Sequence, residues 1–274
     1  MVRPAGPDAV VQRFSEGHAA RRWAEMYDAS TQLLEEANYR RRRDVTVAHV
    51  MRVLPPGGRV LDLGCGTAPV LSELRRHGIA CTGLELAPDM IERARARLRA
   101  MNLDDGDLHR GDCRQTPFED ASFDAIVCLG VISYVEAFED VLREIERLLR
   151  PGGHVIVSFR NRFNPVLWDP YVALKTLAQA VTGRLRAEPY TIGRFMDFRD
   201  VFAEMAACGF EHQEHVGIGF GPIRFRHRAL LPEAVSIRLS DGMAGLLGKL
   251  RWTAPSRWLA DVSLLVYRKP AEPG

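Results

Sequence analysis

Between residues 59 and 159 the chain alternates short apolar runs with longer amphipathic segments. The runs RVLDLG (59–64) and DAIVCLG (124–130) have the length of buried strands, whereas residues 88–100 and 138–149 carry apolar side chains at helical spacing. Strands that alternate with helices of ten or more residues favour βαβ units, which give a parallel sheet with helices on both faces. The pattern therefore predicts an α/β fold.

The segments outside this region break the alternation. Apolar residues recur at helical spacing between residues 14 and 53, so we expect residues 1–54 to form an N-terminal helical lid on a domain that spans residues 55–274. Within that lid, the run Arg40–Arg43 is typical of a solvated helix face. Residues 161–190 and 222–259 interrupt the domain, the second just before the last strand, and we expect both to cap a substrate.

The composition and charge of the chain exclude several classes of protein. The chain has 274 residues, of which 46% are hydrophobic and 26% charged, as in a globular protein. A formal net charge of +2 offers no global field for nucleic acid. The five cysteines have neither metal-ligand nor redox spacing, and no apolar run reaches about 18 residues. We therefore expect a cytoplasmic protein that binds no metal and no nucleic acid.

A glycine-rich loop follows the first predicted strand. Asp62 ends that strand, and Gly64 and Gly66 follow it, which permits a tight turn and lets a ligand approach the backbone. Pro69 then suits the first turn of a helix, whose free amides favour a negative ligand group. A dinucleotide fingerprint needs glycine or alanine at position 69, so Pro69 argues against an oxidoreductase.

Two further acidic residues follow at matching intervals. Glu85 ends the next strand, 19 residues after Gly66, where a carboxylate can accept both ribose hydroxyls of a nucleoside. Asp112 follows one strand and helix later and can accept from an adenine amino group. Each residue alone has an ordinary structural explanation as a solvated carboxylate or a helix cap. Together with the glycines they predict a nucleoside site.

At this point residues 59–159 resemble class I S-adenosylmethionine-dependent methyltransferases, in particular the group that includes ubiquinone and menaquinone biosynthesis methyltransferases. VLDLGCGT resembles the first motif of the family, GLEL its ribose-binding strand end, GDCRQTPFEDASFDAIVC its adenine loop and fourth strand, and RLLRPGGHVIVSF its fifth strand. The resemblance implies a Rossmann-like, seven-stranded, mostly parallel sheet and S-adenosyl-L-methionine as cofactor. It places Gly64 and Gly66 at the methionine part, Glu85 on the ribose, Leu86, Asp112 and Cys113 around the adenine, Leu129 near the sulfonium, and Tyr27 over the cofactor, and it counts Asp62 among the cofactor-binding residues.

The chemistry of a sulfonium methyl group asks little of the protein. The methyl is already activated, so the enzyme has to hold a nucleophile in line with the departing sulfur. By analogy with the fold, Tyr134 and His227 face the methyl, His227 as a candidate base, although a structural histidine is the simpler interpretation. We expect an apolar acceptor of quinone, polyketide or lipid type and oxygen methylation. The alternatives are nitrogen or carbon methylation, or a catalytically silent cofactor-binding regulator.

The segment 222–259 holds seven basic residues against Glu233 and Asp241, with tryptophan and aliphatic residues between them. Such a segment can cover a hydrophobic substrate, form a contact in a homodimer or lie on an anionic membrane surface. The sequence leaves these three roles open.

Overall fold

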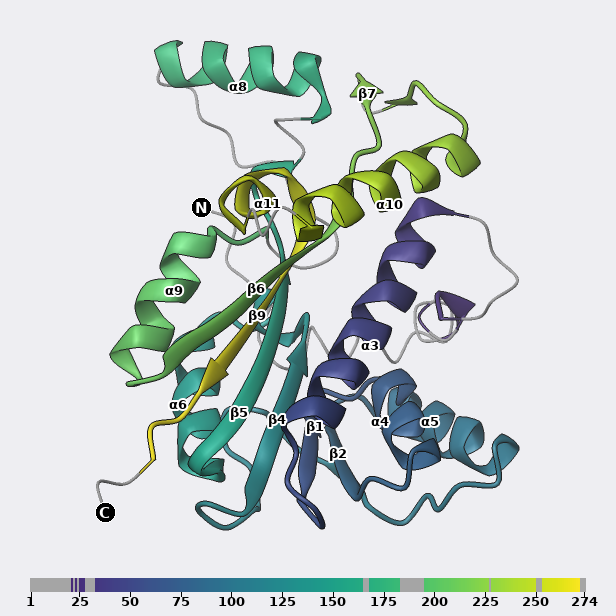
Figure 1. Ribbon diagram of the computed structural model, residues 1–274, viewed down its shortest axis with the longest axis vertical. Coiled ribbons are helices and arrows are strands. Elements are labelled where there is room, and N and C mark those ends of the chain that lie inside the picture. The colour runs from purple at the N-terminus through teal and green to yellow at the C-terminus, as the bar shows by residue number, and fades with distance from the viewer. Residues whose placement is uncertain are drawn as a thin grey trace.

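The computed structural model describes residues 21, 23, 25–27, 33–164, 168–182, 195–226, 228–249 and 253–271 (Figure 1). In chain order its elements are α3 (Leu34–Val53), β1 (Val60–Leu63), α4 (Pro69–Arg76), β2 (Cys81–Glu85), α5 (Pro88–Ala100), β3 (Leu108–Arg110), β4 (Phe123–Leu129), the 3₁₀ turn η1 (Val131–Ser133), α6 (Phe138–Leu148), β5 (Leu149–Arg160), α8 (Pro170–Thr182), α9 (Phe198–Ala207), β6 (Glu211–Phe220), β7 (Arg224–Phe225), β8 (Arg228–Ala229), α10 (Glu233–Lys249), α11 (Thr253–Leu259) and β9 (Ala260–Arg268).

Seven of these strands form one sheet in the order β3-β2-β1-β4-β5-β9-β6. The strands from β3 to β5 run parallel to their neighbours, and β9 is antiparallel to both β5 and β6. In the centre, Asp62 of β1 lies opposite Gly83 of β2 and Val127 of β4. The predicted Rossmann-like, mostly parallel sheet is confirmed.

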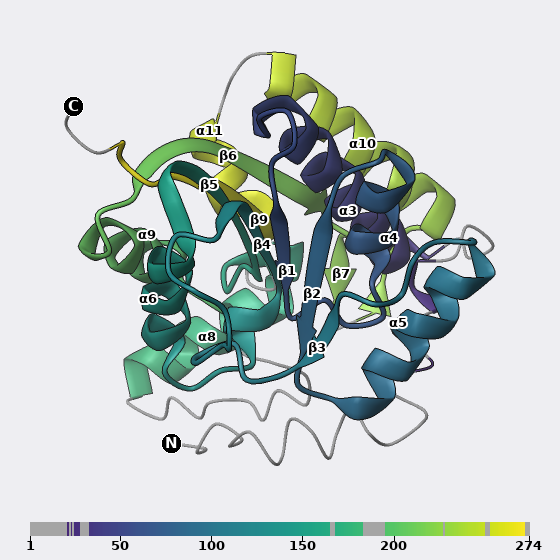
Figure 2. The same ribbon diagram turned by 90° about the horizontal axis from the view of Figure 1, so that it is seen from below.

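Helices cover both faces of the sheet, as the view along the strands shows (Figure 2). On one face α3, α4 and α5 pack over a core that includes Val50, Leu71 and Leu98. On the other face α6 and α9 pack over a second core that includes Ile145 and Val201. Burial of both faces explains why the central strands read as continuous apolar runs.

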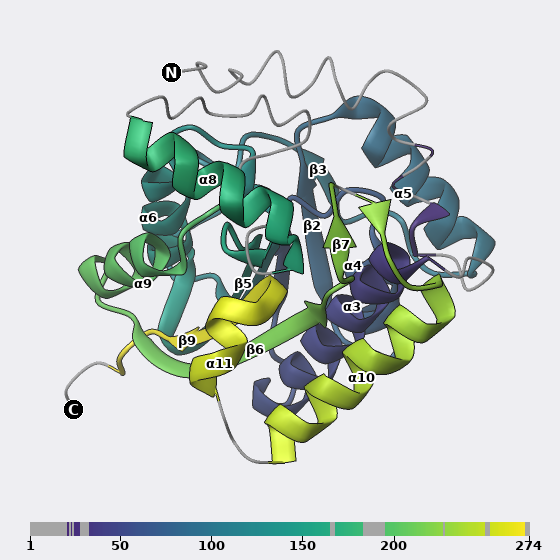
Figure 3. The same cartoon turned by 90° about the horizontal axis from the view of Figure 1, so that it is seen from above.

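The carboxyl ends of the parallel strands meet at one edge of the sheet, and β6 also ends there because it runs parallel to β5. The loops after β1, β2 and β4 lie at this edge, α8 follows the end of β5, and the β7–β8 hairpin follows the end of β6. Figure 1 and Figure 3 show α8, the hairpin and α10 gathered at this same end of the molecule. Open α/β sheets bind their ligands at this edge.

The two expected cap segments contain α8 within 161–190, and β7, β8, α10 and α11 within 222–259. Much of the expected lid, residues 1–54, lies outside the described residues, so the assignment of a separate lid stays a prediction. None of the helices in the described ranges has the length and apolar character needed to cross a membrane.

Candidate active site

A cleft at the carboxyl edge brings together ten of the eleven site residues that the sequence predicts. Its empty volume, counted with the open mouth, is about 1210 Å³. The predicted residues in its lining are Tyr27, Asp62, Gly64, Gly66, Glu85, Leu86, Asp112, Cys113, Leu129 and Tyr134. The eleventh, His227, lies outside the described residues.

The loop after β1 contains two glycines that serve different purposes. Gly64 has φ +75°, and a Cβ built there would lie 2.3 Å from Cγ2 of Val131, so this position admits the η1 turn against the loop. Gly66 has φ +56°, and a Cβ there would meet no atom within 4 Å. Its missing side chain leaves open space in the cleft, where a ligand can approach the backbone. Pro69 occupies the first turn of α4, as predicted.

Glu85 ties this loop to the turn after β2. One carboxylate oxygen accepts from the Gly66 amide at 3.0 Å, and the other accepts from the amides of Leu86 and Ala87 at 2.9 Å each. Burial raises the pKa of Glu85, although the three amide hydrogen bonds oppose that shift. The carboxylate therefore shapes the site, and a ribose bound to it would share these oxygens.

Asp62 is buried in the wall of the cleft. Its Oδ2 atom has no hydrogen-bond partner among the described residues. Burial, with a smaller contribution from the Glu85 carboxylate, raises the pKa of Asp62 to about 7, although a backbone hydrogen bond at Leu71 and the positive charge of Arg42 oppose the shift. A buried carboxyl group with a free acceptor is suited to a ligand ammonium group, because the cation would supply both a donor and the missing charge.

Arg42 corrects the prediction that Arg40–Arg43 is a solvated helix face. Its side chain is buried and lines the cleft, where it donates to the Tyr27 hydroxyl at 2.8 Å and lies 4.6 Å from the Tyr39 ring centroid. A Cβ on Gly130 would lie 3.2 Å from the guanidinium, so the glycine makes room for it. The Arg42 Nε atom has no hydrogen-bond partner among the described residues. An arginine with an unused donor is suited to a carboxylate.

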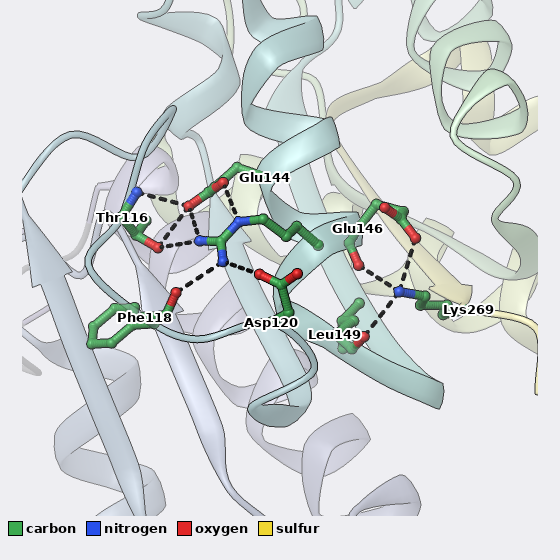
Figure 4. A network of polar contacts seen from close by, with 8 residues as sticks. Thr116, Phe118, Asp120, Glu144, Glu146, Leu149 and Lys269 are labelled. Atoms are coloured by element: carbon green, nitrogen blue, oxygen red, sulfur yellow. Dashed lines mark hydrogen bonds and ion pairs between the residues drawn. The ribbon is translucent and has the colours of Figure 1, made fainter.

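Hydrogen bonds from Arg114 and to Glu144 fix the loop that carries Asp112 and Cys113. Arg114 donates to Asp112 at 2.6 Å and thereby lowers the pKa of the Asp112 carboxyl, so an adenine amino group would have to share that acceptor. Burial raises the pKa of the Cys113 thiol to about 12. At the end of the loop, the amide and hydroxyl of Thr116 both donate to Glu144 at 2.7 Å (Figure 4).

Residues 61–157 match the model of the methyltransferase domain family. A demethylmenaquinone methyltransferase from Tropheryma whipplei is 31% identical over 221 residues, which are 76% of this chain and 88% of that protein. The chain belongs to the class I S-adenosylmethionine-dependent methyltransferases. A ubiquinone biosynthesis O-methyltransferase from Azorhizobium caulinodans is 31% identical over 66% of this methyltransferase and 72% of the relative.

A solved structure agrees on the fold. Magnesium protoporphyrin IX methyltransferase from Synechocystis PCC 6803 with bound SAH has a TM-score of 0.64 at 15% identity and covers 96% of this chain and 100% of its own. The methyltransferase uses S-adenosylmethionine as its methyl donor.

Sequence reasoning missed several residues of the cleft. Trp23 and Met90 line it, and so do Arg42 and Arg114. Met90 lies in the first turn of α5, at the helical end that follows Glu85, so its place could have been inferred from the strand end. Nothing in the arginine run distinguishes Arg42 from its neighbours. Its surroundings in the structure include Tyr27, which precedes α3, and Gly130, which follows β4, and neither contact can be seen in the run itself.

Proposed function

We propose that this methyltransferase transfers the methyl group of S-adenosylmethionine to a hydroxyl group on an apolar small molecule of quinone, polyketide or lipid type. The aromatic and aliphatic part of the cleft supports this acceptor class, because Trp23, Tyr134, Val131 and Val135 line it. The likeness to proteins named for quinones supports the acceptor class, although one of these relatives is named an O-methyltransferase and another a C-methyltransferase.

The cofactor part of the proposal rests on two oppositely charged, buried side chains that line one cleft and that each keep one atom without a hydrogen-bond partner. Asp62 Oδ2 and Arg42 Nε both lack partners among the described residues. The amino-acid end of S-adenosylmethionine bears one ammonium and one carboxylate group, so Asp62 would hold the first and Arg42 the second. The open space at Gly66 and the Glu85 carboxylate would then border the ribose.

The protein's own contribution to the reaction is positioning. When bound, the cofactor supplies an activated methyl group, and the acceptor oxygen has to be held in line with it. Leu129 and Gly130 end β4 in the cleft, and Tyr134 follows η1 beside them. We propose that the Tyr134 ring packs on the acceptor and that its hydroxyl orients the acceptor oxygen. A role for His227 as base stays a prediction.

Product analysis tests the proposal. The full chain is incubated with cofactor labelled in the methyl group and with a quinol that offers both a hydroxyl and an open ring carbon, and the product is identified by NMR. We expect an O-methyl product. A C-methyl product would overturn oxygen methylation, whereas transfer to no member of a set of quinols, polyketide phenols and lipids would overturn the acceptor class. Tyr134→Phe should lower kcat several-fold and leave cofactor affinity unchanged.

A further inference from the structure

Helix α10 leaves large apolar side chains exposed to water. It packs on α3 and β6, and its inward side consists of the buried Ser236 and Ser240 and the partly buried Met243 and Leu247. Ser240 accepts a hydrogen bond from the Phe220 amide at 3.0 Å. The outward side shows Leu239, which is 53% exposed, and Leu246, which is 56% exposed, whereas a surface helix in water normally presents polar residues on that side.

The neighbouring segments expose large apolar side chains as well. On α8, Leu174 is 67% and Leu177 is 62% exposed, and Phe225 in the hairpin is 51% exposed. Ten of the twelve large apolar side chains that are exposed in the described part of the chain lie between residues 171 and 258, so they are concentrated rather than scattered. We call Leu174, Leu177, Phe225, Leu230, Leu239 and Leu246 the apolar face. The elements that carry it, α8, the β7–β8 hairpin and α10, lie in the upper part of the molecule in Figure 1.

The charges around the apolar face are mostly positive, because its acidic residues are engaged elsewhere. Glu233 accepts from the Leu34 amide at 2.9 Å, and Asp241 pairs with Arg41, so both carboxylates contact α3. In contrast, Arg224, Arg228 and Arg238 form no ion pair with any residue in the described ranges. The surface therefore combines exposed aliphatic side chains with unpaired cations.

We propose that the apolar face docks on the surface of an anionic lipid bilayer. Aliphatic and aromatic side chains can enter the interface between headgroups and acyl chains, while arginines beside them pair with anionic headgroups. A second copy of the chain fits less well, because a symmetric contact would bring the same arginines together while Glu233 and Asp241 already contact α3. Docking here places the membrane beside the carboxyl edge of the sheet, where the cleft opens.

This inference deepens the proposed function, since an apolar acceptor partitions into a bilayer, yet it rests on different residues. Its test uses no acceptor, so its failure is distinguishable from failure of the proposed function. The full chain is floated with vesicles of phosphatidylcholine alone and with vesicles of equal parts phosphatidylcholine and phosphatidylglycerol. We expect binding to the anionic vesicles and several-fold weaker binding to the neutral ones.

Two sets of variants separate the apolar and the charged contributions. Leu174→Asp with Leu177→Asp should reduce flotation with anionic vesicles at least several-fold, and Arg224→Gln with Arg228→Gln and Arg238→Gln should weaken binding by roughly 10- to 100-fold. Met51→Asp changes another exposed apolar residue, which lies in the last turn of α3 and outside the apolar face, and serves as the control. Each variant is checked for its melting temperature and for calorimetric binding of S-adenosylmethionine.

The proposal is overturned if the folded wild-type chain stays with the buffer at every vesicle composition. It is also overturned if binding is unaffected by both sets of variants or falls equally in Met51→Asp. Sedimentation equilibrium supplies the remaining outcome: a dimer that Leu174→Asp with Leu177→Asp dissociates, without vesicle binding by the wild type, would assign the apolar face to a second copy instead.

Discussion

Arg42 carries the strongest single-residue prediction. Replacing its guanidinium by the neutral amide in Arg42→Gln should weaken S-adenosylmethionine binding roughly 10-fold or more, because a hydrogen bond to a charged group contributes about 1.5–3 kcal/mol. Arg41→Gln is the matched control, since Arg41 is next to it but pairs with Asp241 on the surface. Isothermal calorimetry measures both affinities. Wild-type affinity in a folded Arg42→Gln variant would remove Arg42 from the cofactor site.

Asp62 should make cofactor binding release a proton. Burial raises the pKa of Asp62 to about 7, so about half of these carboxyl groups are protonated at pH 7 in the free enzyme. A bound ammonium favours the carboxylate and lowers that pKa, so binding expels the proton and affinity rises as the pH rises through 7. Calorimetry in two buffers of different ionisation enthalpy counts the protons. We expect net release by the wild type and none by Asp62→Asn, and buffer-independent heats would contradict the assignment.

At the scale of single residues, the sequence predicts what local rules determine. Gly64, Gly66 and Glu85 could be placed because each follows a recognisable strand whose end must lie at the same edge as the others. The charge state of Asp62 and the burial of Arg42 could not be placed, since both depend on contacts between separate elements. Nor did the sequence show that the Glu85 carboxylate already accepts three backbone amides.

At the scale of elements, two helices depart from the rule that apolar residues face inward. Helix α3 buries a polar stripe, Asn38, Arg42, Thr46 and His49, and α10 buries serines while it exposes leucines. The spacing of apolar residues identifies such segments correctly as helices, but it does not predict which of their residues are buried. In α3 one residue of this stripe, Arg42, lines the cleft, and in α10 the exposed apolar residues form part of the proposed membrane contact. The exceptions therefore fall where we propose function.

Glu144 of α6 accepts from Thr116 and so anchors the loop that carries Asp112 and Cys113, which gives a prediction for this helix. Burial alone would raise the pKa of Glu144, but hydrogen bonds from Arg147 and Thr116 outweigh it and hold that pKa below its usual range. The ionised carboxylate therefore stabilises the fold above the unfolded-state pKa, and this contribution is lost as the pH falls through the lower, folded-state pKa. Glu144→Gln should lower the free energy of unfolding by roughly 1–3 kcal/mol at pH 7.

The same helix supplies the control for that change. Glu146 pairs with Lys269 at 2.8 Å, but its side chain is partly exposed, and Lys269 also donates to the backbone oxygens of Glu146 and Leu149 (Figure 4). Glu146→Gln should therefore cost less than about 1 kcal/mol. Urea unfolding across a pH series compares the two variants with the wild type. Equal losses, or a Glu144→Gln loss that persists unchanged in acid, would show that the Thr116–Glu144 contact is not the anchor.

At the scale of the whole molecule, the arrangement of cleft and apolar face predicts how an acceptor arrives. Both lie at the carboxyl edge of the sheet, because α8 follows β5 and the hairpin follows β6. The βαβ alternation was enough to predict the sheet and its edge. It could not predict that residues 161–190 and 222–259, which lack that alternation, would place their exposed apolar residues at the same end of the molecule.

An acceptor with a long apolar tail should therefore be methylated more efficiently when anionic vesicles are present. The vesicles concentrate both tailed acceptor and enzyme on one surface, so kcat/KM should rise roughly tenfold or more through a lower KM, with kcat little changed. The same acceptor without its apolar tail stays in water, and the kcat/KM for this tail-less acceptor should not change when vesicles are added. Leu174→Asp with Leu177→Asp should abolish the stimulation for the tailed acceptor and leave the tail-less reaction at the wild-type rate. Equal stimulation of the variant would show that the acceptor reaches the cleft through solution, whatever the enzyme contacts with its apolar face.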